Sequence, residues 1–195
     1  MKVLTSSFGS MNLITNILEI FWLVIFLLLD MVFSLIRASS PLLIFVYMLG
    51  YAISFLLTLR FLTVVHENTH ASVASFFSIK TKICYYHKNE KGRKTFKPYC
   101  LFEKSDEITK GAFIIIALAP AIVLSLIIIT FLFFSKMYLA HYPEVFYFGF
   151  IILVLKLWGC SGDLILVIGA CKESKGVKFQ QTEAGNFKVI KINDA

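Results

Sequence analysis

The fold of this protein is decided by residues 42–70, which read LLIFVYMLGYAISFLLTLRFLTVVHENTH. The first part, Leu42–Val65, is almost wholly apolar and exceeds the roughly 20 residues that cross the hydrocarbon core of a bilayer. The last five residues, His66–His70, carry an HExxH pattern. The stretch therefore predicts a membrane-spanning helix that ends in a candidate metal-binding motif.

Three further segments share this apolar character and length: Asn12–Ile36, Ala112–Phe134 and Val145–Val167. The chain is 58% hydrophobic and holds 20 phenylalanines in 195 residues, more than a soluble core of this size requires. We predict an all-α membrane protein with a small β-hairpin element. Its four-transmembrane-helix bundle covers about 12–36, 42–70, 112–134 and 145–170, and residues 1–195 are expected to form one membrane-embedded domain.

Positive charge is concentrated in two parts of the chain. The net charge is +7, nine of the 19 Lys and Arg residues lie in 76–110, and five more follow Cys171. Because cytoplasmic segments carry such an excess, the loop 76–110, the tail 172–195 and both termini are predicted to face the cytoplasm. This distribution favours contact with the lipid bilayer and argues against a nucleic-acid partner.

Two segments of the cytoplasmic parts have the composition of β-hairpins. Thr81–Tyr86 and Lys94–Cys100 are rich in β-branched and aromatic residues and flank the polar run 87–93. The tail repeats this pattern more weakly in Val177–Thr182 and Phe187–Ile192. We expect two small hairpins, which could share one sheet.

Charged residues also occur inside the predicted spans, at Glu19, Asp30, Arg60 and Lys156. A lone charge at such depth costs several kcal/mol, so these side chains are expected to face the interior of the bundle, and pairing is the preferred interpretation for Arg60 and Lys156.

The HExxH pattern has a direct chemical interpretation. His66 and His70 are four residues apart and lie on one face of a helix, so both imidazoles can reach one Zn²⁺ while Glu67 handles the proton of a metal-bound water. A chance occurrence of the pattern is the alternative. A hydrolytic zinc site usually needs a third protein ligand from elsewhere in the chain.

Asp163 is the candidate third ligand, within Gly159-Cys160-Ser161-Gly162-Asp163 of the last span. A structural pairing of Asp163 with Lys156 is the alternative. Cys160 is a second candidate, although a small apolar residue in a packed helix explains it as well. The four cysteines form no CxxC pair, and no structural disulfide is predicted.

Depth along the helices supports Asp163. At 1.5 Å per residue, His66–His70 lies within about 10 Å of the inner end of its span, and Asp163 about 13 Å from Lys172. Pro120 lies about 12 Å from Ala112, at the same level. A proline inside a helix removes one backbone hydrogen bond, and the expected kink could admit water.

These motifs give the chain a resemblance to a known family. Over roughly residues 45–170 it resembles the bacterial integral-membrane zincin peptidases, which are distantly similar to site-2 proteases. The matching elements are His66–His70, the basic loop 76–110, Leu118-Ala119-Pro120 and Ser161-Gly162-Asp163. The resemblance implies a bacterial plasma-membrane location and assigns roles to several residues: His66, His70 and Asp163 as zinc ligands, Glu67 as the catalytic residue, and Pro120, Ser161 and Gly162 as supporting residues.

The sequence thus predicts a zinc metallopeptidase that hydrolyses a membrane protein or peptide at or near the cytoplasmic face, with Glu67 activating a zinc-bound water. Two alternatives belong to other classes, a non-catalytic membrane accessory or scaffold protein and a metal-ion transporter. A transporter needs a polar route across the bilayer, and the third span offers only Ser125 and Thr130 beyond Pro120. The sequence does not indicate an oligomeric state.

Overall fold

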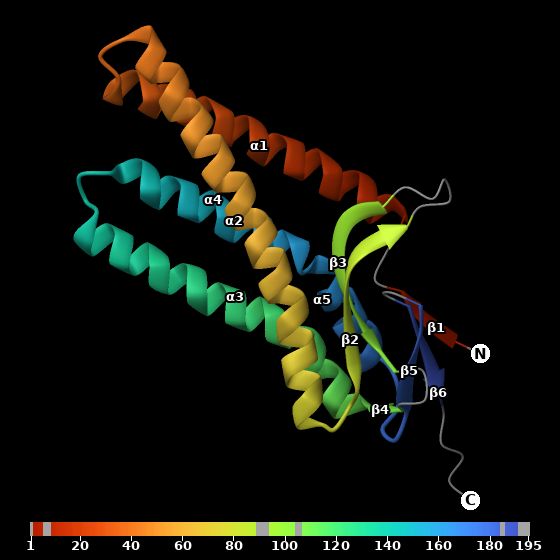
Figure 1. Ribbon diagram of the computed structural model, residues 1–195. Coiled ribbons are helices and arrows are strands. Elements are labelled where there is room, and N and C mark those ends of the chain that lie inside the picture. Colours follow the sequence, from red (N-terminus) through yellow and green to blue (C-terminus); the bar gives the residue numbers. More distant parts are fainter. Residues whose placement is uncertain (1, 6–8, 89–93, 104–106, 184–185, 191–195) are drawn as a thin grey trace, which may run out of the picture. The chain divides into compact units, whose positions relative to one another are not determined.

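The computed structural model describes residues 2–5, 9–88, 94–103, 107–183 and 186–190. Within them lie five helices, which are α1 (Gly9–Arg37), α2 (Pro41–Phe76), α3 (Lys110–Tyr138), α4 (Pro143–Gly159) and α5 (Ser161–Cys171) (Figure 1). They provide four candidate membrane spans by length and composition, because α4 and α5 together form the last one. The predicted class, a mostly helical protein with four long apolar spans and small antiparallel sheets, is confirmed.

The last span departs from the single helix expected over 145–170. It is interrupted at Cys160, between α4 and α5. Gly159 and Gly162 flank this position, and glycine weakens a helix because its backbone loses more freedom on ordering than that of other residues. The amide of Leu164 donates to the Cys160 carbonyl at 3.1 Å, which closes the first turn of α5. The interruption thus gives Asp163 a place in the first turn of a new helix.

Helix α2 continues past the expected end at residue 70 and reaches Phe76. It ends where Ser78 adopts a left-handed backbone conformation, with a φ of 58°. The amides of Phe77 and Ile79 then donate to the Ala74 carbonyl at 3.0 and 3.1 Å, as is common where a helix ends in a left-handed residue. The whole HExxH motif therefore lies inside a regular helix.

The chain divides into two compact units. The first, here called the site unit, comprises residues 1–8, 63–123 and 160–195; the second, called the helical unit, comprises residues 9–62 and 124–159. The expectation of one membrane-embedded domain stays a prediction.

The site unit contains two antiparallel sheets. One pairs β2 (Thr81–Lys88) with β3 (Lys94–Phe102), and the other has the strand order β1-β6-β5-β4, formed by Lys2–Thr5, Asn186–Ile190, Lys178–Glu183 and Ile108–Thr109 (Figure 1). Both predicted hairpins are therefore confirmed where the structure describes them; residues 89–93 of the first, and 184–185 and 191–192 of the second, lie outside the described residues.

The two hairpins lie in different sheets, so the shared sheet that the sequence allowed does not form. Part of the reason lies in the edge of β3 that faces away from β2. The Phe102 amide there donates to the side chain of Gln181 at 2.6 Å instead of to a strand backbone, and the Cys100 amide donates to Glu67. Because side chains use these donors, β3 cannot continue the ladder into β5 at these positions.

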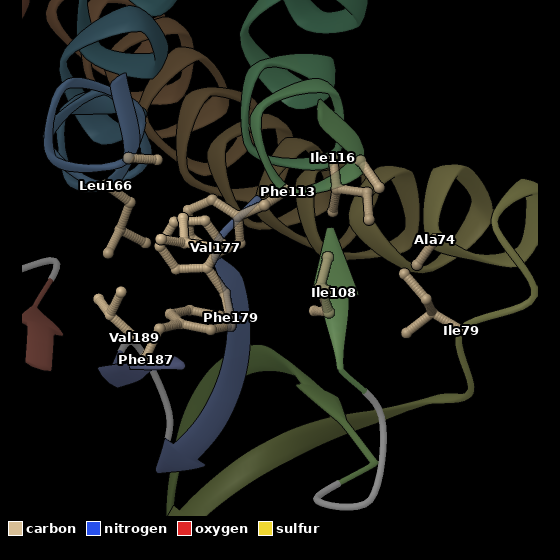
Figure 2. Packing of buried hydrophobic residues seen from close by; sticks show 12 residues of the cluster. Ala74, Ile79, Ile108, Phe113, Ile116, Leu166, Val177, Phe179, Phe187 and Val189 are labelled. Carbon is tan, nitrogen blue, oxygen red and sulfur yellow. The ribbon is translucent and has the colours of Figure 1, made fainter. Parts of the chain in front are cut away.

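A hydrophobic core joins the helices of the site unit to the larger sheet. Phe113 of α3 stacks on Phe179 of β5 with ring centroids 4.4 Å apart, and it meets Phe187 of β6 edge-on at 4.8 Å. Leu166 of α5 and Ala74 of α2 belong to the same buried cluster (Figure 2). This packing holds α2, α3 and α5 together, and these three helices carry the candidate site.

The helical unit has a separate aromatic core. Phe26 stacks on Phe55 with centroids 3.9 Å apart, and Ile151 is buried beside them. Near the ends of α1 and α4, Arg37 forms an ion pair with Glu144 at 3.2 Å, and the hydroxyl of Tyr51 donates to the same carboxylate at 3.3 Å. These contacts give the buried Glu144 charged and polar partners, which it requires away from water.

The charged residues within the spans do not all behave as expected. Asp30 is buried and accepts a hydrogen bond from Ser34 at 3.3 Å, which confirms the expectation for this residue. Arg60 is exposed and Lys156 is half-buried, so the expected inward position is wrong for Arg60. A long arginine side chain can cover apolar surface with its methylene groups while the guanidinium stays outside. The Glu19 side chain lies outside the described residues.

Candidate functional site

Three side chains of the site unit converge on one point. His66 and His70 come from consecutive turns of α2, and Asp163 comes from the first turn of α5. Their potential ligand atoms all lie within 4.8 Å of one another. The Nε2 atoms of His66 and His70 are 3.2 and 3.5 Å from the same Asp163 oxygen. The side chains of these three residues are between 11% and 18% exposed, so a ligand held among them would be largely shielded from solvent.

The spacing of these atoms fits a zinc ion. Two imidazole nitrogens and one carboxylate oxygen are a usual protein ligand set for catalytic zinc. Ligand atoms about 2.1 Å from a tetrahedral ion are about 3.4 Å from one another, and the two separations between histidine and Asp163 are 3.2 and 3.5 Å. The donor set and these two separations therefore suit Zn²⁺.

Nδ1 of His70, the ring nitrogen that does not face Asp163, has a backbone partner. Its Nδ1 lies 2.9 Å from the carbonyl oxygen of Ile116 in α3, and the contact is buried. A carbonyl can only accept, so Nδ1 carries the hydrogen of this bond. With its hydrogen on Nδ1, the neutral ring can offer Nε2 as a ligand to a metal held beside Asp163.

Nδ1 of His66, the ring nitrogen that does not face Asp163, lies beside Cys160. The Cys160 sulfur lies 3.6 Å from Nδ1 of His66, on the opposite side of the ring from the nitrogen that faces Asp163. Cys160 is buried and is absent from the group of converging ligand atoms. The structure thus gives this thiol a place behind a candidate ligand. Its position three residues before Asp163 was the only sequence signal for such a role.

Glu67 lies beside the histidines and is held by strand β3. One carboxylate oxygen, Oε2, accepts a hydrogen bond from the Cys100 amide at 2.8 Å, and the other, Oε1, is 3.8 Å from Nε2 of His66. The side chain is 14% exposed. This arrangement fixes one oxygen and leaves the second beside the candidate ligands. The sequence did not point to Cys100 here, because the contact uses its backbone.

The three residues expected to support the site have different positions. Ser161 and Gly162 precede Asp163 in the first turn of α5, where the helix dipole favours a negative side chain. Pro120 is buried inside α3, which continues through it to Tyr138. The water route expected at Pro120 stays a prediction.

The thiol of Cys100 is buried, and the carboxylate of Glu67 lies near it. Burial, reinforced by the negative charge of Glu67, raises the pKa of Cys100 to about 12. A raised pKa favours the protonated form of the thiol. Cys100 is therefore a neutral, packed side chain at physiological pH.

This protonation state has a measurable consequence. We expect iodoacetamide at pH 8 to modify the exposed Cys171 first and to modify Cys100 only after unfolding, because the buried thiol is both inaccessible and protonated. Mass spectrometry of peptides from a labelling time course measures both rates. Equal labelling of the two cysteines in the folded protein would contradict the burial of Cys100.

Comparison with known proteins places this geometry in a family. The chain matches the model of a family described as "putative zincin peptidase" over residues 59–177, which is more than half of its length. No curated protein and no solved structure matches it. The matched segment includes every residue of the candidate site, and the family description implies zinc. The chain therefore belongs to the "putative zincin peptidase" family.

Proposed function

We propose that this protein is a membrane-embedded zinc metallopeptidase that hydrolyses peptide bonds at or near the cytoplasmic face of the plasma membrane. The observation that carries the proposal is the convergence of His66, His70 and Asp163 at zinc-ligand spacing, with Glu67 beside them. Membership of the zincin peptidase family and four candidate membrane spans support it.

In this proposal His66, His70 and Asp163 hold the metal. A bound zinc ion is a Lewis acid that makes water acidic near neutral pH and polarises a peptide carbonyl. The protein's contribution is to present both histidines in the required form. Ile116 and Cys160 face the Nδ1 atoms, so both Nε2 atoms are directed at the site.

Glu67 is the proposed general base and acid. Its free oxygen accepts a proton from the attacking water and later returns a proton to the leaving amine. The hydrogen bond from the Cys100 amide holds the carboxylate in place, so less orientational freedom is lost when a substrate binds. Helix α2 positions Glu67 directly next to His66, so base and ligand share one rigid element.

The length of α2 supports a site at the membrane boundary. From Pro41 to His66 the helix rises about 37 Å, which exceeds a hydrocarbon core of about 30 Å. A helix that enters the bilayer near Pro41 therefore brings His66 close to the opposite surface, where the basic segment 76–110 begins. By the positive-inside rule that surface is cytoplasmic. The substrate is then a membrane protein or peptide whose backbone becomes accessible there.

The test uses the full chain in lipid nanodiscs. We expect about one zinc per chain by elemental analysis, and cleavage of a library of membrane-anchored fluorogenic peptides. Cleavage should stop with 1,10-phenanthroline and return when Zn²⁺ is added, because the chelator removes the Lewis acid.

Other outcomes would favour the other classes. Zinc flux in proteoliposomes without peptide cleavage would replace the proposal with a transporter. A chain that neither binds zinc nor cleaves any library peptide would be left with an accessory or scaffold role.

A further inference from the structure

Pro120 changes the hydrogen bonding of α3 at the level of the candidate site. In an α-helix the amide of residue 120 would donate to the carbonyl of residue 116. Proline has no amide hydrogen, so this bond cannot form between Pro120 and Ile116. The carbonyl of Ile116 is the group that His70 Nδ1 contacts at 2.9 Å. The helix therefore lacks one internal bond where α2 supplies a side-chain donor.

The missing amide hydrogen at Pro120 and the contact of His70 with the Ile116 carbonyl depend on each other. A buried carbonyl without a donor is costly, and so is a buried imidazole N–H without an acceptor. The contact between His70 and Ile116 satisfies both groups. Ile116 belongs to the buried cluster that joins α3 to the C-terminal part of α2, which keeps the oxygen within reach of the imidazole (Figure 2).

We propose that Pro120 is a positioning residue for His70. By withholding an amide hydrogen it reserves the Ile116 carbonyl for Nδ1 of His70, and this fixes the imidazole as an Nε2 ligand. The inference rests on the proposed zinc site, since a fixed Nε2 lone pair serves metal binding. Nδ1 of His66 faces only a sulfur atom at 3.6 Å, a weaker acceptor, so His70 is the more firmly oriented of the two histidines.

The decisive comparison separates the effect of the missing amide hydrogen from the effect of the proline ring. Pro120→Ala removes the ring and adds an N–H that competes for the Ile116 carbonyl. An ester analogue with lactic acid at position 120 also removes the ring but adds no N–H. Pro143→Ala is a further control, because Pro143 is the first residue of α4, where a helix needs no amide bond.

Two readouts are measured on the full chain in nanodiscs. The first is whether Nδ1 of His70 carries a hydrogen in the metal-free protein, read from the ¹⁵N shift of that nitrogen in labelled histidine. The His70 signal is assigned by its loss in His70→Gln. The second is zinc affinity by competition with a chelating indicator.

We expect Nδ1 of His70 to carry a hydrogen bonded to the Ile116 carbonyl in the wild type, and to lose this hydrogen in part of the molecules in Pro120→Ala. Zinc affinity should fall about 10- to 100-fold in that variant, the usual effect of losing the partner of a metal-bound histidine. The ester analogue and Pro143→Ala should match the wild type in both readouts. The inference is overturned if Pro120→Ala leaves both readouts unchanged, or if the ester analogue shows the same defects, which would assign the effect to ring packing. A wild type that binds no zinc counts against the proposed function, while the hydrogen on Nδ1 of His70 in the metal-free protein still decides the role of Pro120.

Discussion

Replacing Asp163 by asparagine is expected to weaken zinc binding by about 10²- to 10³-fold. A structural zinc site with four protein ligands contributes roughly 10–16 kcal/mol, or about 2.5–4 kcal/mol per ligand, which corresponds to about 10²- to 10³-fold in affinity. Asp163 is also the only charged member of the converging group, and both Nε2 atoms lie against its carboxylate. An amide oxygen in its place carries no charge to offset that of the metal. Competition with a chelating indicator measures the change.

Asp30→Asn provides the matched control for this experiment. Asp30 is likewise a shielded aspartate in a candidate membrane span, but it belongs to the helical unit. The Asp30→Asn variant is expected to keep a zinc affinity within about twofold of the wild-type value, because Asp30 does not belong to the converging group of ligand residues. If both asparagine variants lost zinc equally, the effect would reflect general damage to the fold and not the loss of a ligand.

Replacing Glu67 by glutamine is expected to lower the rate of peptide cleavage by about 10²- to 10⁴-fold while zinc remains bound. The lost rate is the usual contribution of a general acid–base, about 3–5 kcal/mol of activation free energy. The amide oxygen of glutamine can still accept the bond from the Cys100 amide, so the side chain should keep its position without taking a proton. Single-turnover cleavage and zinc content are measured on the same preparation.

Glu103→Gln is the corresponding control. Glu103 follows β3, pairs with Lys80 at 3.6 Å, and has a side chain that is 47% exposed. We expect this variant to cleave peptides at the wild-type rate. Full activity in Glu67→Gln would remove Glu67 from the mechanism, and loss of zinc in that variant would make its role structural.

The parts of the structure that follow from composition were predictable from the sequence. Each span is a long apolar run, and the hairpins are short runs of β-forming residues around polar turns, so local signals were sufficient. The approach of Asp163 to His66 and His70 followed from counting residues along two helices that cross the membrane in the same direction, which gives the depth of each residue. These predictions needed only side-chain chemistry and one-dimensional spacing.

The parts that escaped prediction depend on backbone groups and tertiary contacts. Every residue has an amide and a carbonyl, so nothing in the sequence singles out the Cys100 amide or the Ile116 carbonyl as partners of Glu67 and His70. The interruption at Cys160 was not predicted, because the apolar run around it is long enough for one continuous helix. The exposure of Arg60 was not predicted, because hydropathy does not show which face of a helix is buried.

The order in which the ligands occur along the chain has a consequence for biosynthesis. His70 is made about 90 residues before Asp163, an interval of roughly 5–20 s at ordinary rates of translation. Throughout that time the nascent polypeptide has the HExxH helix but lacks the carboxylate that completes the ligand set. Under the proposed function, the chain would therefore lack a complete ligand set until the final span has left the ribosome, and would not cleave its neighbours at the insertion machinery before then.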